Sequence, residues 1–307
     1  MPLDPAAQAV LKLLEEAGAP PFEEQTPTEA REAFAGLVPL GGEGAAVASV
    51  AERDVGGVPA LVVTPDGEGP FPVLVWIHGG GWVIGSAIES QATARDLAAG
   101  AGCVVVSLDY RLAPEHKAPA ALDDCLAATR WVLDHAGELG GDPGRVAIGG
   151  DSAGGNLSAL VALELGDRLR YQVLVYPATD LSATADADPS MIENADGYLL
   201  TKATMDWFID HYLDGSGLTG DDLQVSPAKA SDAALGRTPP AFVITAEFDP
   251  LRDQGEAYAR RLEEAGCAVE ARRYDGVFHG FFGMRELIDP AQEAFDDVTK
   301  ALREAFA

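Results

Sequence analysis

Ser152 has the sequence context of a nucleophile for acyl transfer. It lies in GDSAG at residues 150–154, which fits the pattern G-x-S-x-G, between the apolar run RVAIG and the helix-like run AGGNLSALVALEL. Where a strand turns sharply into a helix, only small residues fit beside the serine, and its hydroxyl stands exposed above the sheet. A serine is a weak nucleophile at neutral pH, so this chemistry needs a neighbouring base.

His279 is the histidine best placed to be that base. It is one of five histidines and lies in GVFHGF, after the apolar run CAVEARRY and before the last predicted helix. This position brings it to the same end of a parallel sheet as Ser152. By contrast, His135 and His211 are expected on helix surfaces, and His78 is expected to hold a loop by packing and hydrogen bonding.

The base needs an acidic partner that fixes its tautomer and stabilises the imidazolium. Asp249 follows the predicted strand AFVIT, again at the carboxyl end. Asp253 falls within the next predicted helix and should point away, and Glu247 lies closer to the end of the strand. We therefore expect Asp249 to be the partner, because the order serine, aspartate, histidine is the order of α/β-hydrolases.

The stretch HGGGW at residues 78–82 predicts a place for the negative charge that attack creates on a carbonyl oxygen. It follows the apolar run PVLVWI, and its glycines let backbone N–H groups approach a ligand unhindered. Losing one such donor typically costs ~2.7–4 kcal/mol of barrier lowering. A further donor is expected at Ala153, the residue after the nucleophile.

The elements that must position these residues alternate between strand and helix. Apolar runs at 71–78, 103–108, 145–150, 171–177, 241–247 and 267–274 predict strands, and helical patterns lie between them. This alternation indicates a mostly parallel α/β sheet flanked by helices. Two runs at 46–55 and 58–65 predict an antiparallel pair at the sheet edge.

Two segments interrupt that rhythm and are expected to form a helical cap. Residues 4–36 are helical and are broken by prolines, and residues 180–225 are an insertion with one helix at about 202–213. Open α/β sheets bind ligands at the carboxyl ends of their strands, which the insertion should cover. The expected division is cap helices at 1–45 and an α/β-hydrolase catalytic domain at 46–307.

The composition of the chain limits the classes of partner and the location that are expected. The 307 residues carry a formal charge of −28, which repels phosphate backbones and makes nucleic acid an unsuitable partner. No apolar run suggests a membrane span, and the acidic start does not resemble a secretory signal, so a cytoplasmic location without stable membrane association is expected.

Two further patterns predict no metal or dinucleotide site. Cys103, Cys125 and Cys267 lack the spacing of metal ligands. The sequence G-x-G-x-x-G at 215–220 follows a predicted helix and not a strand, so it is interpreted as a simple turn.

Together the motifs resemble the bacterial hormone-sensitive-lipase-like esterases of the α/β-hydrolase superfamily. The matching stretches are HGGGWVIGS, LDYRLAPEHKAPAALDD, GGDSAGGNLSA, VYPATD, EFDPLRDQGEAYARRL and VFHGF. The resemblance implies hydrolysis of short to medium acyl esters by Ser152, Asp249 and His279, without a cofactor or a metal. It implies backbone donors at Gly80, Gly81 and Ala153, in a loop shaped by Gly79.

The resemblance also bears on the pocket. We expect Trp82, Asp151, Trp207 and Phe208 to line it under the cap. Gln254 stands where the family often has glutamate, and this departure suggests looser support around Asp249.

Three alternatives stay open at this point. An amidase such as an arylformamidase would share the triad and differ in its leaving group. A non-catalytic ligand receptor on the same fold would lack the histidine that this chain has at His279. A lipase acting on insoluble fat fits the charge of −28 less well. The resemblance suggests that CAVEARRY is an edge strand that pairs between subunits of a homodimer. The alternative is that Arg272 and Arg273 blunt that edge against pairing.

Overall fold

Eight strands form one sheet in the order β1-β2-β4-β3-β5-β6-β7-β8 in the computed structural model, which describes residues 2–307. Strands β3 to β8 run parallel to one another, whereas β2 pairs antiparallel with both β1 and β4. The strand bounds are Ser49–Val55 (β1), Val58–Thr64 (β2), Phe71–Ile77 (β3), Val104–Leu108 (β4), Gly141–Asp151 (β5), Tyr171–Val175 (β6), Ala241–Phe248 (β7) and Val269–Phe278 (β8).

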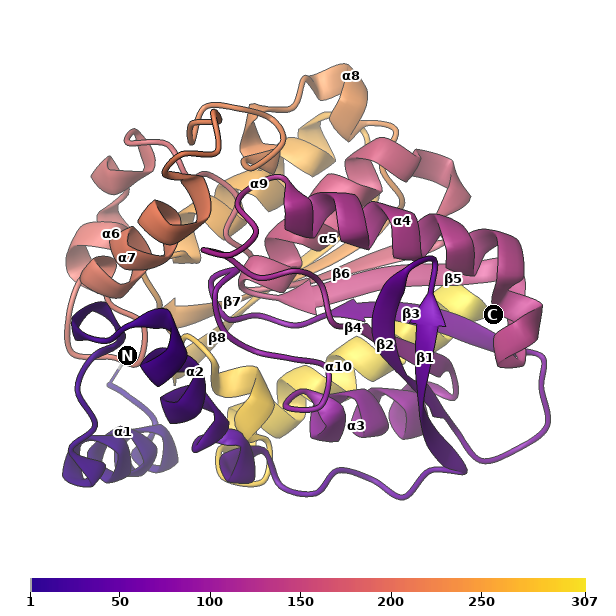
Figure 1. Cartoon of the computed structure of the whole chain (residues 1–307), viewed down its shortest axis with the longest axis horizontal. Helices are drawn as coiled ribbons and strands as arrows, with labels where there is room; N and C mark the ends of the chain where they lie inside the picture. Colours follow the sequence, from indigo (N-terminus) through magenta and orange to yellow (C-terminus); the bar gives the residue numbers. More distant parts are fainter. Residues whose placement is uncertain (1) are drawn as a thin grey trace.

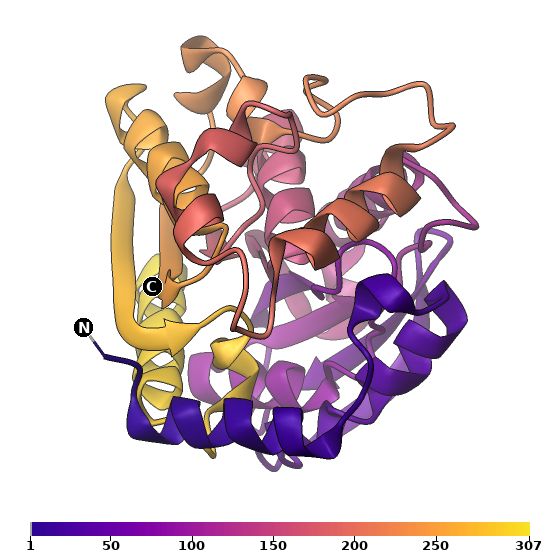
Figure 2. The same ribbon diagram turned by 90° about the vertical axis from the view of Figure 1, so that its left-hand side faces the viewer.

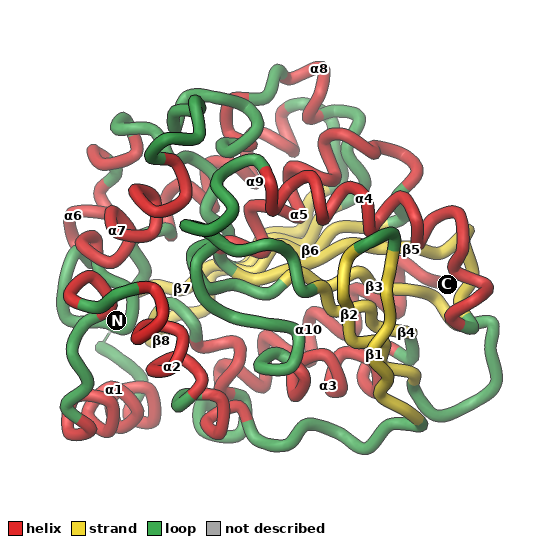
Figure 3. The backbone as a smooth tube through the Cα atoms, in the orientation of Figure 1, coloured by secondary structure: helices red, strands yellow, loops and turns green. Residues whose placement is uncertain are grey.

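Helices cover both faces of this sheet. In Figure 1, α4, α5 and α9 lie on one face and α3 and α10 on the other. Their bounds are Gln91–Ala101 (α3), Ala120–His135 (α4), Ala153–Leu165 (α5), Arg252–Glu264 (α9) and Asp289–Phe306 (α10). Figure 3 shows the strands as a layer between these helices. Two-sided cover explains why the central strand β4 is buried along its whole length and rich in valine.

The N-terminal segment folds as two helices, α1 (Pro5–Ala17) and α2 (Pro27–Ala35), as the prolines predict. A proline begins each helix, where its missing N–H costs nothing. At α2 the Thr26 hydroxyl accepts from the Glu29 N–H, and the Glu29 carboxylate accepts from the Thr26 N–H. The short 3-10 helix Phe22–Glu24 between them contacts helix α7 (Lys202–Leu213) of the insertion.

The insertion at 180–225 lies at the same end of the molecule as the N-terminal helices, as Figure 2 shows. Besides α7 it holds a second short helix, α6 (Pro189–Glu193), that the sequence pattern did not predict. Another unpredicted helix, α8 (Asp232–Leu235), follows the insertion. The buried amide of Asn156 on α5 donates to the carbonyls of Ala178 and Val225, and so holds both ends of the insertion.

Gln254 also supports the start of the insertion. Its side-chain oxygen accepts from the backbone N–H groups of Thr179 at 2.6 Å and Asp180 at 2.9 Å. The expectation that Gln254 bears on Asp249 is therefore wrong: its hydrogen bonds go to the loop after β6, and an amide oxygen serves there as an acceptor.

Arg31 fastens α2 to the body of the protein. Its guanidinium donates to the carbonyls of Val83 and Ala113 at 2.8 and 2.9 Å, and it pairs with the Glu115 carboxylate at 2.7 Å. The hydrogen bond from Arg31 lowers the pKa of Glu115 from 4.5 to about 2.

This depressed pKa gives a pH-dependent contribution to stability. The contribution is present above the unfolded pKa of Glu115 and is lost as the pH falls from 4.5 towards 2. Because the pair is solvent-exposed, we expect it to be worth less than ~1 kcal/mol. Urea unfolding of wild type and Glu115→Gln between pH 6 and 2 should give free-energy curves that converge in acid, whereas a constant gap would contradict the assignment.

Candidate active site

Ser152 occupies the sharp turn between β5 and α5. Its backbone has φ 55° and ψ −119°, a strained conformation for a residue with a side chain. The flanking glycines make the turn feasible, because a Cβ on Gly154 would lie 1.9 Å from the carbonyl oxygen of Ile77, and one on Gly150 would lie 2.4 Å from the same atom. The Ser152 N–H donates to the Val175 carbonyl at 2.8 Å, which ties the turn to β6.

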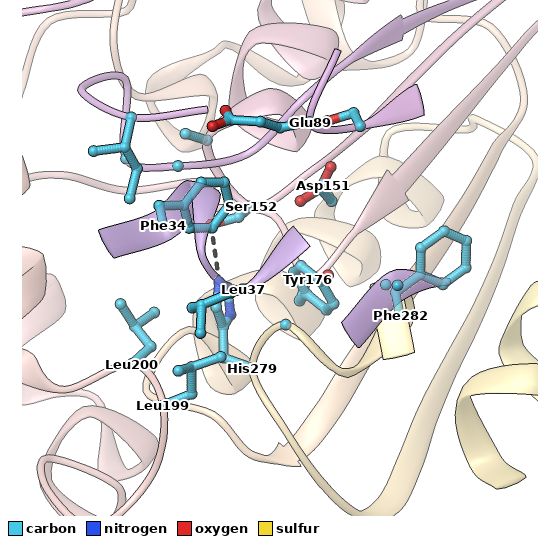
Figure 4. A pocket seen from close by; sticks show the side chains of 18 of the residues that line it. Phe34, Leu37, Glu89, Asp151, Ser152, Tyr176, Leu199, Leu200, His279 and Phe282 are labelled. Atoms are coloured by element: carbon cyan, nitrogen blue, oxygen red, sulfur yellow. Dashed lines mark hydrogen bonds between the residues drawn. The ribbon is translucent and has the colours of Figure 1, made fainter. Parts of the chain in front are cut away.

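A continuous chain of hydrogen bonds joins Ser152, His279 and Asp249. The His279 Nε2 atom lies 2.9 Å from the Ser152 Oγ, and Nδ1 lies 2.7 Å from the Asp249 carboxylate. The first of these contacts is drawn in Figure 4. A carboxylate only accepts, so Nδ1–H donates to Asp249 and Nε2 is left to accept the serine proton.

Asp249 is fully buried and its carboxylate is well supported. Its other oxygen accepts from the Leu251 N–H at 2.8 Å. Asn194, which follows α6 in the insertion, donates its side-chain amide to the Asp249 backbone carbonyl at 3.2 Å. The insertion therefore braces the acidic residue directly, a contact that sequence reasoning missed because no local motif marks Asn194.

The other two candidates for the acidic partner form their hydrogen bonds away from His279. The Asp253 carboxylate accepts from the Ser190 N–H at 2.8 Å and pairs with Arg252. The Glu247 carboxylate accepts from the Gly276 N–H at 2.7 Å. Both carboxylates thus accept hydrogen bonds from the backbone around the site, and Asp249 is the acid that contacts His279.

Tyr176 is a further residue of the site that sequence reasoning missed. It follows β6, is buried with φ 35°, and its ring centroid lies 4.5 Å from that of His279. Its N–H donates to the Ile244 carbonyl at 2.7 Å, so the strained backbone is fixed to β7. Burial raises the pKa of Tyr176 well above its usual value, so the ring packs on the imidazole as a neutral phenol. The only available signal was its place at the carboxyl end of a strand.

The glycines of HGGGW differ in what their N–H groups do. The Gly79 N–H donates to the Asp151 carboxylate at 3.2 Å, so it is engaged and cannot also bind a substrate oxygen. In residues 2–307 the N–H groups of Gly80, Gly81 and Ala153 donate to no protein acceptor. These three are thus free to bind an oxygen beside Ser152, whereas Gly79 only shapes the loop.

Asp151 holds this loop from the side of β5. Burial raises the pKa of Asp151 to about 6, against the opposing effects of the Gly79 N–H and of His279. The fit is close, because a Cβ on Gly79 would lie 2.4 Å from an Asp151 carboxylate oxygen.

Aromatic rings hold the other side of the loop. Trp82 is buried with φ 61°, and its ring stacks on Tyr212 of α7 at 4.7 Å and 5°. The buried ring of His78 stacks on Tyr110 at 4.4 Å, and its Nδ1 lies 2.7 Å from the Gly79 carbonyl. His78 is therefore a packing residue, as expected.

A cavity of about 210 Å³ opens beside Ser152. Its wall is mostly apolar and comes from the N-terminal segment, the glycine loop, α7 and the region after His279. Trp82, Asp151 and Phe208 line it as expected. Trp207 does not, because its ring lies against Phe208 at 5.2 Å and His211 at 4.4 Å instead.

The glycine loop tolerates no side chain at Gly80. That residue has φ 107°, and a Cβ would lie 2.2 Å from the Ile84 carbonyl oxygen, a backbone atom that cannot move independently. We expect Gly80→Ala to displace its N–H and lower kcat by about 10²–10³-fold. In Gly81→Ala the Cβ meets the Phe208 ring at 2.1 Å, so adding Phe208→Ala should restore part of the activity. Equal rescue of Gly80→Ala by Phe208→Ala would contradict this difference.

Within residues 2–307 no group of three or more His, Cys, Asp or Glu side chains could hold a metal ion. Cys103, Cys125 and Cys267 are buried free thiols. No helix in the described part of the chain has the length and apolarity to cross a membrane.

Known proteins that are similar to this chain share the alpha/beta hydrolase fold or are ester hydrolases. A family model described as the alpha/beta hydrolase fold matches residues 74–283. The carboxylic ester hydrolase LipN of Mycobacterium tuberculosis is 43% identical over 257 residues, covering 81% of this chain and 67% of the relative. An ethyl acetate hydrolase of Pseudomonas putida is 37% identical over 264 residues, covering 83% and 81%. The crystal structure of a thermostable esterase from Pseudomonas putida superposes with a TM-score of 0.92 at 36% identity, covering 100% and 98%.

Proposed function

The chain belongs to the alpha/beta-hydrolase family, and on that premise we propose that it is a serine carboxylesterase with Ser152, His279 and Asp249 as its catalytic triad. The observation that carries the proposal is the unbroken hydrogen-bonded chain from carboxylate to hydroxyl, beside three free backbone donors. Relatives that hydrolyse carboxylic esters, among them LipN and the ethyl acetate hydrolase, support the same activity.

Acylation begins when the Ser152 oxygen attacks the ester carbonyl as His279 Nε2 takes the hydroxyl proton. Negative charge then develops on the carbonyl oxygen, where the N–H groups of Gly80, Gly81 and Ala153 stabilise it. Asp249 stabilises the imidazolium through Nδ1–H. The imidazolium gives its proton to the departing alcohol, which leaves an acyl group on Ser152.

Deacylation repeats these steps with water. His279 takes a proton from water, the resulting hydroxide attacks the acyl carbonyl, and the proton passes to the Ser152 oxygen as the acid is released. No metal or cofactor enters this cycle.

The cavity suits short to medium acyl groups. A volume of about 210 Å³ with walls such as Phe34, Met205 and Phe208 holds a modest apolar chain. We assign the cap to the N-terminal helices and the insertion, because Phe34 belongs to α2 and the other two belong to α7. The division at residue 45 and the cytoplasmic location remain predictions.

A homodimer through β8 also remains a proposal. β8 is an outer strand of the sheet, and its residues 270–273 are exposed. Arg272 pairs with Glu293 and Asp297, and Arg273 pairs with Glu256, so both guanidinium groups are bound within their own chain. Light scattering would decide, with a monomer mass overturning the proposal.

The ester specificity is tested against the amidase alternative. We expect rapid hydrolysis of p-nitrophenyl butyrate, little hydrolysis of N-formylkynurenine, and inactivation by one equivalent of a serine-directed phosphonate. Faster turnover of the formamide would make the amidase the better assignment. Absence of turnover on both substrates would instead favour a ligand receptor.

A further inference from the structure

The cavity beside Ser152 has negative charge in its wall and no positive side chain. Among its lining residues there is no lysine or arginine, and the carboxylates are those of Glu89 and Asp151. Asp151 already accepts from the Gly79 N–H and braces the glycine loop. Glu89 is the carboxylate that neither the triad nor this loop uses.

Glu89 is half-buried in the loop that leads from the glycine turn into α3. One of its oxygens accepts from the Ser86 hydroxyl at 2.9 Å, and within residues 2–307 the other accepts no hydrogen bond. Burial raises the pKa of Glu89, with the Ser86 hydrogen bond acting against it. The Asp109 carboxylate also raises the pKa of Glu89, and the side chain offers one unengaged carboxyl oxygen.

The surroundings of Glu89 suit a cation. The neighbouring hydroxyls of Ser90 and Thr93 also line the cavity, and neither hydrogen-bonds to another group in the described residues. Aromatic rings, including those of Phe22, Phe34 and Phe208, form other parts of the wall, and ring faces attract ammonium groups. Outside the cavity, the formal charge of −28 concentrates cations and repels anions near the mouth.

We propose that Glu89 makes this esterase selective for esters that carry a positive charge, and that it disfavours esters carrying a carboxylate. The inference rests on the proposed function and names the substrate class of the same site. In Figure 4, Glu89 and the pair Leu199 and Leu200 lie on opposite sides of the Ser152–His279 contact. The leaving oxygen must face His279 to receive its proton, so this arrangement favours a charge in the acyl part.

The experiment compares matched esters in two arms, assayed by kcat/KM at pH 7.5. In the acyl arm, p-nitrophenyl 6-aminohexanoate is compared with neutral p-nitrophenyl heptanoate and with the anionic p-nitrophenyl monoester of adipic acid. In the alcohol arm, butyrylcholine is compared with its uncharged isostere 3,3-dimethylbutyl butyrate. We expect a cationic preference of about tenfold in at least one arm, and the arm that shows it locates the charge.

Glu89→Gln keeps the shape and removes the charge, so the preference should fall close to one. Glu89→Lys should reverse it and favour the adipate monoester. Glu52→Gln removes an equal charge from an exposed position on β1 and should leave the preference intact, which separates a local effect from the overall field.

The outcomes are distinguishable from failure of the proposed function. If the neutral esters are hydrolysed but the cationic preference is absent, or persists in Glu89→Gln, charge selection by Glu89 is wrong while ester hydrolysis stands. A preference lost equally in Glu52→Gln also overturns it. If none of the five esters is turned over, both proposals fail.

Discussion

Ser152→Ala is expected to lower kcat by about 10⁶-fold, because removing the nucleophile of a triad costs nearly as much as removing the whole triad. The Oγ atom lies 2.9 Å from the only base in the hydrogen-bonded chain. The change adds no atoms to the strained turn, so the fold and the cavity should be retained. Single-turnover and steady-state assays with p-nitrophenyl butyrate measure the loss.

The chain offers a matched control for this change. Ser158 lies on the same helix α5, is fully buried, and its hydroxyl has no hydrogen-bond partner in residues 2–307. Ser158→Ala should therefore retain turnover, and both variants should unfold at similar temperatures. Substantial esterase activity in correctly folded Ser152→Ala would place the nucleophile elsewhere.

Asp249→Asn is expected to lower kcat by about 10⁴-fold. The carboxylate accepts from His279 Nδ1 at 2.7 Å and so keeps Nε2 free for the serine proton. An asparagine amide can donate to Nδ1, which shifts the ring proton to Nε2, and the base is then lost. The pH-rate profile and kcat of the variant test this, because the defect is in chemistry and KM should change little.

Asp253→Asn is the matched control for the acidic partner. Asp253 lies four positions away and binds the Ser190 N–H and Arg252. Its loss should weaken the start of α6 and reduce stability, with turnover falling far less than in Asp249→Asn. If the two variants were equally inactive, the structural link between α6 and the triad, and not the tautomer of His279, would explain the loss.

The α/β-hydrolase fold expected from the sequence is confirmed by the eight-stranded sheet and by the family match. The likeness to hormone-sensitive-lipase-like esterases is confirmed by relatives that are ester hydrolases. Strands such as β3 were predicted correctly because burial on both faces requires a continuous apolar run, which is visible in the local sequence. The helix α6 was missed because its Ser190 is held by Asp253 and by the Pro250 carbonyl, residues about 60 positions away.

The end of β8 was also missed, for a similar reason. The apolar pattern ends at Tyr274, but the strand continues to Phe278, which pairs with Phe248 after an irregularity in the register. The Glu247 carboxylate of β7 accepts a hydrogen bond from the N–H of Gly276, which lies between Tyr274 and Phe278. A bulge held by a side chain of another strand leaves no mark in the local sequence.

Local sequence also has limits at the candidate site. The places of Ser152, His279 and Asp249 follow from strand ends, since parallel strands bring their carboxyl ends together. The contacts of Tyr176 and Asn194 depend on how distant segments approach, which no spacing reveals. The engagement of the Gly79 N–H depends on Asp151, which lies on a different strand from the glycine loop. The catalytic roles themselves remain predictions.

The contacts that hold the two segments assigned to the proposed cap affect how a substrate can reach Ser152. Arg31 donates to the carbonyl of Val83 from α2, and Tyr212 of α7 stacks on Trp82, so both segments contact the turn that follows Gly80 and Gly81. Moving either segment away would have to break its contact with that turn. We therefore expect saturation kinetics on dissolved monomers, with no jump in rate where an ester begins to form droplets.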